Sequence, residues 1–296
     1  MTQSFLFSVI IPTYNRPERL RQCLSALAEQ TLAPQQFEIM VIDDGSDCPL
    51  EPVVAAVQAK APQLIIRLSR QTNAGPAQAR NAGAARAAGH YLVFTDDDCA
   101  PLPDWLEQFA AQLQGHPDCL MGGYTINALA QNPFSTASQL LIDYLYSYYN
   151  REAQASFFAS NNFVLPRAAF LAKGGFDTSF PLAAGEDREL CDRLVQQGYP
   201  MRYAPQAQIR HYHSLTLRKF WRQHFNYGRG AYHFHQVRAQ RQAAPVQVEP
   251  LSFYTRLLTY PFAQPDRLRA VSLSLLMFLS QVANVAGFFW ERRRAA

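Results

Sequence analysis

Short apolar runs alternate with helix-length segments over the first hundred residues, and this alternation constrains the fold more than any other feature. The predicted strands are residues 5–11, 37–42, 64–68 and 91–94, and the predicted helices between them are residues 17–30, 52–60 and 73–88. Strands separated by helices of this length form a mostly parallel sheet with helices on both faces. The sequence therefore predicts an α/β fold.

Polar residues follow three of the predicted strands at their carboxyl ends. They are Thr13 with Tyr14, Asp43 with Asp44, and the run from Asp96 to Asp98. In an open α/β sheet, ligands bind just beyond the carboxyl ends of the strands. We therefore expect these side chains to share one rim of the sheet and to form a ligand site there.

Three adjacent carboxylates, Asp96, Asp97 and Asp98, follow the strand at residues 91–94. Residues two apart in an extended chain project the same way, so Asp96 and Asp98 are expected to face one point. Mg²⁺ or Mn²⁺ suits such a point, because hard cations take carboxylate oxygens and complete their coordination with substrate phosphates. The alternative interpretation is a solvated acidic turn.

Two other elements of the rim also have a purely structural alternative. Residues 43–46, Asp-Asp-Gly-Ser, form either a turn that uses the freedom of glycine or a site where a carboxylate meets a nucleotide base. Arg80 either covers its helix as a solvated polar residue or contacts a diphosphate through its fork of N–H donors. The sequence leaves both pairs of alternatives open.

Several motifs occur in a specific order along the chain. They are Ser-Val-Ile-Ile-Pro-Thr-Tyr-Asn-Arg-Pro at 8–17, Val-Ile-Asp-Asp-Gly-Ser at 41–46, Asn-x-Gly at 73–75, Ala-Arg-Asn-x-Gly at 79–83, Phe-Thr-Asp-Asp-Asp at 94–98, Gly-Gly-Phe-Asp at 174–177, Gly-Glu-Asp at 185–187 and Gly-Tyr at 198–199. Together they resemble family 2 of the glycosyltransferases over roughly residues 5–230.

This resemblance implies a GT-A fold, a Rossmann-like sheet that binds a nucleotide-diphosphate sugar and a divalent metal. It implies that Tyr14 and Asp44, or Asp43, hold the base. The residues expected at the nucleotide are Pro12, Thr13, Tyr14, Asn15, Arg16, Asp43, Asp44, Asn73, Gly75, Arg80, Asp96 and Asp97. The expected metal ligands are Asp96, Asp98, His211 and His213.

An acidic pair, Glu186 and Asp187, opens a predicted helix that Gly198 ends. Acidic residues in a first helical turn are ordinary partners of the helix dipole. The functional alternative is a general base, because glycosyl transfer with inversion needs a carboxylate to take the proton of the acceptor hydroxyl. The resemblance places this base at Asp187, with Glu186 as the substitute.

His211 and His213 lie two apart in a strand-like segment, so their side chains are expected to project alike. A packed or surface role is the alternative, but the predicted acidic site nearby favours metal ligation. The resemblance favours His211 as the ligand.

Two aromatic and glycine-containing segments are open to more than one interpretation. The tyrosines of residues 144–149 suit the core, an acceptor groove or a membrane interface. Gly228 and Gly230 interrupt the predicted helix at 216–238, which indicates a bend or a close approach to substrate. Arg229 between them either reaches a phosphate or is exposed to solvent.

The composition shifts after about residue 241. Residues 242–250 form a linker, and residues 270–290 are an uncharged, mostly apolar run long enough to span a membrane. Arginines flank this run on both sides, at 267 and 269 and at 292–294. Because Arg tends to stay on the cytoplasmic side, we expect peripheral attachment to an anionic membrane surface at the inner face, without a single crossing.

Composition and cysteine spacing restrict the partners and the cellular compartment that are expected. The 27 Lys and Arg residues nearly balance the 23 Asp and Glu residues, which argues against a nucleic-acid partner. The five cysteines are scattered and have no C-x-x-C spacing, which indicates reduced thiols in a cytoplasmic protein. The apolar run at 5–12 is short and ends in proline, so no signal peptide is expected.

These observations predict a GT-A domain at residues 1–240, with a nucleotide-binding half at 1–100 and an acceptor half at 101–240. A helical, partly hydrophobic extension that associates with the membrane is predicted at 241–296. The predicted activity is metal-dependent, inverting transfer of a sugar from a nucleotide-diphosphate sugar, with UDP favoured, to a glycan or lipid-linked acceptor. The alternatives are a sugar nucleotidyltransferase and a non-catalytic glycan-binding or scaffold protein.

Overall fold

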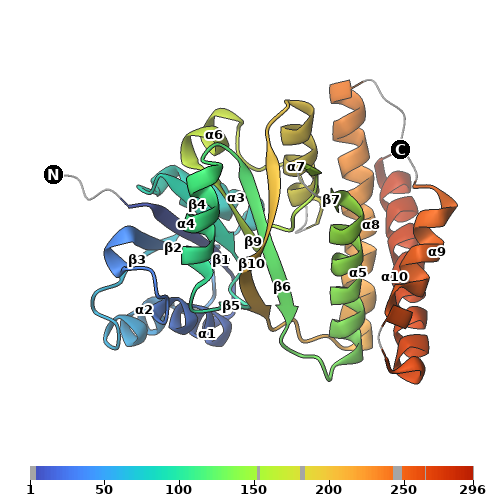
Figure 1. The fold of residues 1–296 in the computed structure, drawn as a ribbon, viewed down its shortest axis with the longest axis horizontal. Coiled ribbons are helices and arrows are strands. Elements are labelled where there is room, and N and C mark those ends of the chain that lie inside the picture. The colour runs from blue at the N-terminus through green and yellow to red at the C-terminus, as the bar shows by residue number, and fades with distance from the viewer. Residues whose placement is uncertain (1–4, 152–153, 181–183, 243–248, 264, 296) are drawn as a thin grey trace.

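One large sheet with helices on both faces forms the centre of the protein (Figure 1). The structure is a computed structural model, and it describes residues 5–151, 154–180, 184–242, 249–263 and 265–295. The sheet has eight strands in the order β3-β2-β1-β4-β9-β6-β10-β5. Since strands and helices alternate along the chain and most neighbouring strands of the first half are parallel, the predicted α/β fold is confirmed.

The first half of the chain follows the predicted pattern closely. Its strands are β1 (Phe7–Thr13), β2 (Phe37–Asp43), β3 (Ile65–Arg70) and β4 (Tyr91–Thr95), which pair in parallel. Its helices are α1 (Pro17–Ala28), α2 (Glu51–Gln58) and α3 (Pro76–Arg86), with the short helix η1 (Pro34–Gln36) before β2. β1, β2 and β4 are buried along their whole length because helices cover both faces.

The second half completes the sheet and adds two strands of reversed direction. Its elements are β5 (Cys99–Pro101), α4 (Trp105–Gly115), β6 (Leu120–Asn127), β9 (Asn162–Pro166), α6 (Arg167–Ala172), α7 (Glu186–Gln196) and β10 (Met201–His211), with a small hairpin of β7 (Asn150–Arg151) and β8 (Gln154–Ala155). β9 is antiparallel to both β4 and β6, so it joins the two halves of the sheet. The sequence pattern did not predict β5, α4 or β6.

A layer of long helices stands beside the sheet. It contains α5 (Pro133–Tyr149), α8 (Leu217–Gln242), α9 (Leu251–Thr259), η2 (Tyr260–Ala263) and α10 (Arg267–Ala295). Figure 1 shows α8 and α10 side by side over most of their length. These helices share a hydrophobic cluster of their own, separate from the two clusters on the faces of the sheet.

Glycines allow α8 and α10 to approach one another closely. A Cβ atom at Gly228 would lie 1.8 Å from the carbonyl oxygen of Asn284, and one at Gly287 would lie 1.9 Å from that of Phe225. α8 is one continuous helix through Gly228 and Gly230. The close approach expected here therefore exists, but the neighbour is a helix of the same chain.

The tyrosines of α5 pack mostly inside the protein. Tyr144 donates a hydrogen bond from its hydroxyl to the carbonyl oxygen of Phe253 and stacks against that ring's edge. Tyr146 is buried among the rings of Phe158 and Tyr203. The core interpretation therefore holds for these two residues, while Tyr149 lines a cleft described below.

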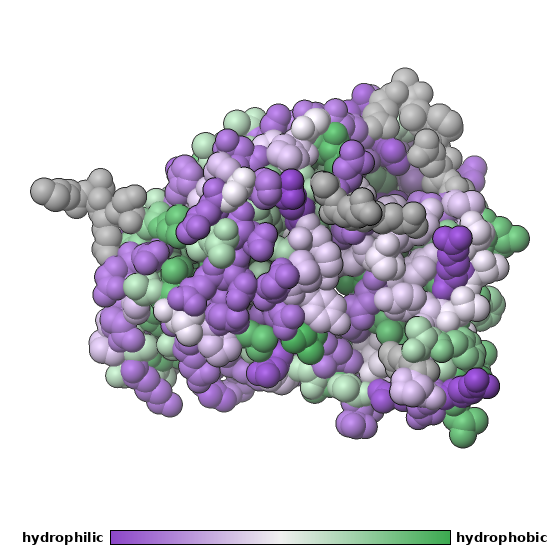
Figure 2. All heavy atoms as spheres, in the orientation of Figure 1, coloured by the Kyte–Doolittle hydropathy of each residue, from purple (hydrophilic) through white to green (hydrophobic). Residues whose placement is uncertain are grey.

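The outer face of α10 is apolar and exposed. Among the described residues, α10 is the one helix long and apolar enough to span a membrane, and 28% of its most apolar window is buried. The exposed large apolar residues of this helix are Leu268, Val271, Leu275, Phe278, Val282, Val285, Phe289 and Trp290. In Figure 2, green patches occur along the right-hand edge, where Figure 1 places α9 and α10.

Candidate active site

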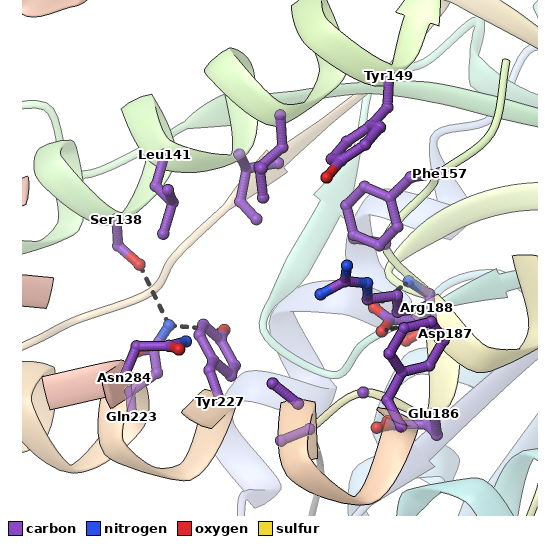
Figure 3. Close-up of a pocket in the computed structure, with 18 of the residues that line it drawn as sticks. Ser138, Leu141, Tyr149, Phe157, Glu186, Asp187, Arg188, Gln223, Tyr227 and Asn284 are labelled. Carbon is purple, nitrogen blue, oxygen red and sulfur yellow. Dashed lines mark hydrogen bonds between the residues drawn. The ribbon is translucent and has the colours of Figure 1, made fainter. Parts of the chain in front are cut away.

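A cleft of about 890 Å³ lies between the sheet and the layer of long helices. Its lining includes Asp96, Glu186, Asp187 and His211, which come from three separated parts of the sequence. Figure 3 shows Glu186, Asp187 and Arg188 on one wall, with Gln223 and Tyr227 of α8 across the gap. The cleft therefore brings together predicted catalytic and metal-binding residues.

Asp187 reaches the cleft from the first turn of α7. Its carboxylate accepts hydrogen bonds from the backbone N–H groups of Arg188, at 2.7 Å, and Ser160, at 3.4 Å. Burial raises the pKa of Asp187 above its usual value, against the opposing effect of these hydrogen bonds. A carboxylate of raised pKa at a cleft wall is suited to accept a proton.

Glu186 is held in a different way, by an arginine. Arg80 is almost fully buried, and it donates from Nη1 to Glu186 Oε1 at 3.2 Å and from Nη2 to Asp96 Oδ1 at 2.7 Å. Burial, together with the charge of Asp187, raises the pKa of Glu186 to about 7, and Arg80 opposes this rise. Arg80 thus links the two halves of the site through two carboxylates.

The acidic run after β4 turns sharply. The backbone N–H of Cys99 donates to the carbonyl oxygen of Asp96, so the chain is not extended there. The carboxylates consequently meet different partners: Asp96 contacts Arg80, and Asp98 contacts His211. The extended geometry that we assumed for Asp96 and Asp98 was wrong.

Asp97 is tied to the end of β1 and the turn after it. It accepts from the Thr13 hydroxyl at 2.8 Å and from the Arg16 guanidinium at 3.2 Å. Burial raises the pKa of Asp97 to about 6, although Arg16 opposes the rise. Arg16 also lies 3.5 Å from Asp98, so it bridges two carboxylates of the run.

Asp98 and His211 form the pair best suited to hold a divalent cation. His211 Nε2 lies 3.3 Å from Asp98 Oδ1, and the two rings of His211 and His213 stack with centroids 4.9 Å apart. Burial alone would raise the pKa of Asp98, but His211 and Arg16 lower it below its usual range. An ionised carboxylate beside an imidazole nitrogen is a fitting donor set for Mg²⁺ or Mn²⁺.

The thiol of Cys99 lies near the same pair, with all three ligand atoms within 4.8 Å of one another. Burial raises the pKa of the Cys99 thiol well above its usual value. Since only the thiolate is a good metal ligand, Cys99 is a weak ligand candidate.

The predicted base-binding residues surround the ends of β1 and β2. Tyr14 is exposed, whereas Asp43 and Asp44 are buried and already accept hydrogen bonds. Asp44 takes the backbone N–H groups of Ala74 and Gly75 and thereby orders the loop before α3. Three residues of this group remain. Asn73 donates to the carbonyl oxygen of Asp44, and Asn15 accepts from the backbone N–H of Asp47. Pro12 lies buried within β1.

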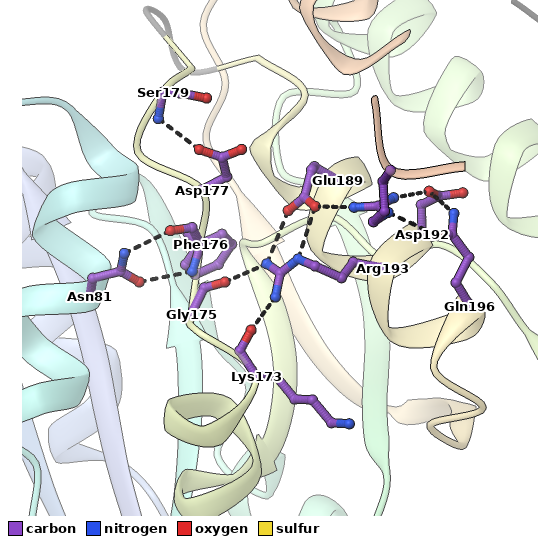
Figure 4. A network of polar contacts seen from close by, with 11 residues as sticks. Asn81, Lys173, Gly175, Phe176, Asp177, Ser179, Glu189, Asp192, Arg193 and Gln196 are labelled. Atoms are coloured by element: carbon purple, nitrogen blue, oxygen red, sulfur yellow. Dashed lines mark hydrogen bonds and ion pairs between the residues drawn. The ribbon is translucent and has the colours of Figure 1, made fainter. Parts of the chain in front are cut away.

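A polar network fixes α7, and our sequence analysis did not anticipate it. Arg193 donates to both oxygens of Glu189, to the carbonyl oxygen of Gly175 at 2.6 Å and to that of Lys173 (Figure 4). Glu189 is only 1% exposed, so this ion pair is held inside the protein. The network anchors the helix that carries Asp187.

Arg229, for which phosphate contact was one alternative, lies elsewhere. It pairs with Glu291 of α10, and its guanidinium carbon lies 4.5 Å from the centre of the Trp290 ring. Arg229 thus ties α8 to the end of α10.

Comparison with known proteins gives the family. The family model for Glycosyl transferase family 2 matches residues 8–176, which is more than half of the chain. The pre-mycofactocin glycosyltransferase of Mycobacterium tuberculosis is 30% identical over 237 residues, which are 76% of this chain and 46% of that protein. The chain spans between 40% and 49% of the length of the first curated relatives that it matches.

Solved structures agree on the fold. The mannosyltransferase PcManGT from Pyrobaculum calidifontis, in complex with GDP-Man and Mn²⁺, has a TM-score of 0.65 at 18% identity, covering 96% of this chain and 88% of its own. S. aureus TarS 1-349, in complex with UDP-GlcNAc, has a TM-score of 0.53 at 17% identity, covering 98% and 91%. These similarities confirm the expected GT-A fold. Because the family model matches more than half of this chain, the chain belongs to glycosyl transferase family 2.

Proposed function

We propose that the protein is a metal-dependent, inverting glycosyltransferase that moves a sugar from a nucleotide-diphosphate sugar to a hydroxyl group of a glycan or lipid-linked acceptor. The observation that carries this proposal is that two neighbouring carboxylates, Glu186 and Asp187, have different partners. Both line the cleft, but Glu186 is paired with Arg80, whereas Asp187 makes only backbone hydrogen bonds with the residues that the structure describes. Asp187 is therefore the proposed general base.

In the proposed step, the acceptor oxygen forms a bond to the anomeric carbon of the donor sugar while its proton passes to Asp187. The bond between the anomeric carbon and the diphosphate breaks, and its electron pair leaves with the nucleotide diphosphate. A single displacement of this kind inverts the configuration at the anomeric carbon.

Asp98 and His211 are the proposed holders of Mg²⁺ or Mn²⁺, with Asp96 and His213 beside them. The bound ion would neutralise charge on the departing diphosphate, which removes the need for a general acid. Arg16 lies at the edge of the same site and is 56% exposed along its side chain, so it has room to bind a phosphate.

The nucleotide is proposed to lie along the rim from Pro12 to Arg16, with the exposed ring of Tyr14 against the base. Asp43 and Asp44 shape that end of the site, and Asn73 and Gly75 belong to the loop that Asp44 orders. PcManGT was solved with GDP-Man and TarS with UDP-GlcNAc, and both are nucleotide-diphosphate sugars. We favour a UDP-linked donor for this chain.

The two alternatives have less support. A sugar nucleotidyltransferase needs a Gly-rich loop bearing Arg or Lys after the first strand, and residues 12–15 are Pro-Thr-Tyr-Asn. A glycan-binding scaffold needs no metal-binding or catalytic carboxylates, yet Asp187 lines the cleft and Asp98 contacts His211, which also lines it.

Release of nucleotide diphosphate from a panel of UDP- and GDP-sugars, with Mn²⁺ and with excess EDTA, tests the proposal. We expect turnover that EDTA abolishes and that Asp98→Ala abolishes as well. Asp118→Ala, at an exposed acidic residue of the same chain, is the matched control and should leave turnover unchanged. Full activity in excess EDTA would contradict the metal-dependent mechanism.

A further inference from the structure

Arg188 stands next to the proposed base and belongs to no ion pair in the described part of the chain. Its guanidinium carbon lies 4.5 Å from the centre of the Phe234 ring of α8, and its side chain lines the cleft. Figure 3 shows it beside Asp187, on the wall that faces Gln223. A cation held by an aromatic ring and open to a cleft is available to an anionic group of a ligand.

Most of the other charged residues around Arg188 already have partners. Arg238 lines the same cleft and pairs with Asp192, which also pairs with Arg241. Burial, followed by the charges of Arg188 and Arg238, lowers the pKa of His235 to about 4, so this neighbour stays neutral at physiological pH. Glu249, just before α9, also lines the cleft, and its carboxylate accepts hydrogen bonds from the hydroxyls of Tyr148 and Tyr149.

Beyond this cationic section, the cleft becomes apolar. A chain of ring contacts leads away from Arg188: Phe234 lies 5.3 Å from His235, His235 lies 6.2 Å from Phe288, and Phe288 lies 5.7 Å from Phe289. Other apolar residues that line the cleft are Leu141 and Leu145 of α5, Phe253 of α9 and Val285 of α10.

The apolar section opens on the exposed face of α10. Val285 and Phe289 line the cleft and are also 54% and 50% exposed, so the same side chains belong to the apolar surface of the helix. The exposed apolar surface of α10 is therefore continuous with the cleft lining at these two side chains.

We infer that the acceptor is a phosphate-bearing lipid, whose hydroxyl meets Asp187, whose phosphate meets Arg188 and whose apolar chain lies between α5, α9 and α10. This inference rests on the proposed function, and it narrows the acceptor from glycans in general to one chemical class. The cleft offers one partner for each part of such a molecule: a proton acceptor at Asp187, a cation at Arg188 and apolar side chains of the helices.

Binding of simple probes to the full chain tests the phosphate and apolar contacts without knowledge of the acceptor sugar. The probes are farnesyl phosphate, farnesol and inorganic phosphate, each titrated in the presence of UDP and Mn²⁺. Farnesyl phosphate should bind at least about tenfold more tightly than either of the others, because it uses both the cation and the apolar channel. Equal affinity for farnesyl phosphate and farnesol would overturn the inference.

Substitutions then assign the two contacts. Arg188→Gln should reduce the affinity for farnesyl phosphate to that for farnesol, while Leu145→Asn should weaken both apolar probes. Arg86→Gln, at an exposed arginine of α3 outside the cleft, is the matched control and should change neither affinity.

A measurement of donor affinity distinguishes a failure of this inference from a failure of the proposed function. Arg188→Gln should leave the affinity for UDP with Mn²⁺ unchanged, since the metal site and the rim hold the donor. If UDP affinity falls as far as farnesyl phosphate affinity, Arg188 serves the donor and the inference is wrong. If the unsubstituted protein binds no nucleotide diphosphate at all, the proposed function itself fails.

Discussion

At the scale of single residues, two arginines of the site each pair with two carboxylates. Arg80 contacts Asp96 and Glu186, and Arg16 contacts Asp97 and Asp98. Each arginine lowers the cost of placing like charges close together in a partly buried site. Among Asp96, Asp97, Asp98, Glu186 and Asp187, only Asp187 has no ion pair with an arginine within the described part of the chain.

Asp187→Asn tests the role of this carboxylate directly. The amide keeps the shape of the side chain but cannot take a proton, so turnover should fall by about 10²–10⁴-fold. UDP binding with Mn²⁺, measured by calorimetry, should remain. A variant with nearly normal kcat would move the role of base to Glu186 or to another group.

Arg80→Met should change the pH dependence of turnover. Arg80 lowers the pKa of both Glu186 and Asp187, so its removal raises both values, and a base of higher pKa becomes protonated at higher pH. The acid limb of the kcat profile should therefore move upward by roughly one pH unit or more. Arg80→Lys, which keeps the charge, should shift the limb much less; an identical profile for both variants would contradict the electrostatic role.

At the scale of elements, the strands and helices that the sequence predicted are specified by nearby residues, whereas the missed ones depend on residues far away in the sequence. β1, β2, β4 and their helices follow from apolar runs and from proline and glycine at helix ends, which are local signals. β6 contains Gly122 and Gly123, which strands disfavour, and it exists because Phe158 and Asn162 pack against those positions. No local pattern reveals such a contact.

The candidate site shows the same difference. The motifs located the acidic run, the acidic pair and the histidines, and the fold brings several of them to one cleft. The partners of those residues were not predictable, because Arg80 meets Glu186 across 106 positions of sequence and the chain turns at Asp96. Arg188 carried no signal either, since its importance comes from its neighbours in space.

The contact between α8 and α10 gives a prediction about stability. Gly228→Ala places a methyl group against the backbone oxygen of Asn284, and backbone cannot rotate away as a side chain can. We expect the free energy of unfolding to fall by about 1–3 kcal/mol, as for other overpacked interiors, with a lower Tm.

Gly115→Ala is the matched control for this prediction. It lies at the end of α4, and a Cβ atom there meets nothing within 4 Å. The control should be neutral or slightly stabilising, because alanine favours helix more than glycine does. Equal Tm values for the two variants would show that the helices separate at little cost.

At the scale of the whole molecule, the exposed face of α10 bears on where the protein works. Leu268, Val271, Leu275, Phe278, Val282, Val285 and Phe289 recur at intervals of three and four residues, so they form one apolar stripe along the helix. The opposite face of α10 packs on α8 through Gly228 and Gly287. A span through a membrane would carry α8 and its exposed Arg222 into the hydrocarbon, which is costly.

We therefore predict that α10 lies along an anionic membrane surface, with the stripe at the headgroup boundary and arginines at both ends. The full chain should sediment with vesicles that contain anionic phospholipid, and added salt should weaken this binding because it screens the arginines. Leu275→Glu should lower the partition coefficient by about tenfold, since it removes a leucine from the apolar contact and adds a like charge to the lipid. Leu171→Glu makes the same chemical change at an exposed leucine of α6 and should leave partitioning unchanged. Equal loss in both variants, or sedimentation that ignores lipid charge, would remove α10 as the contact surface.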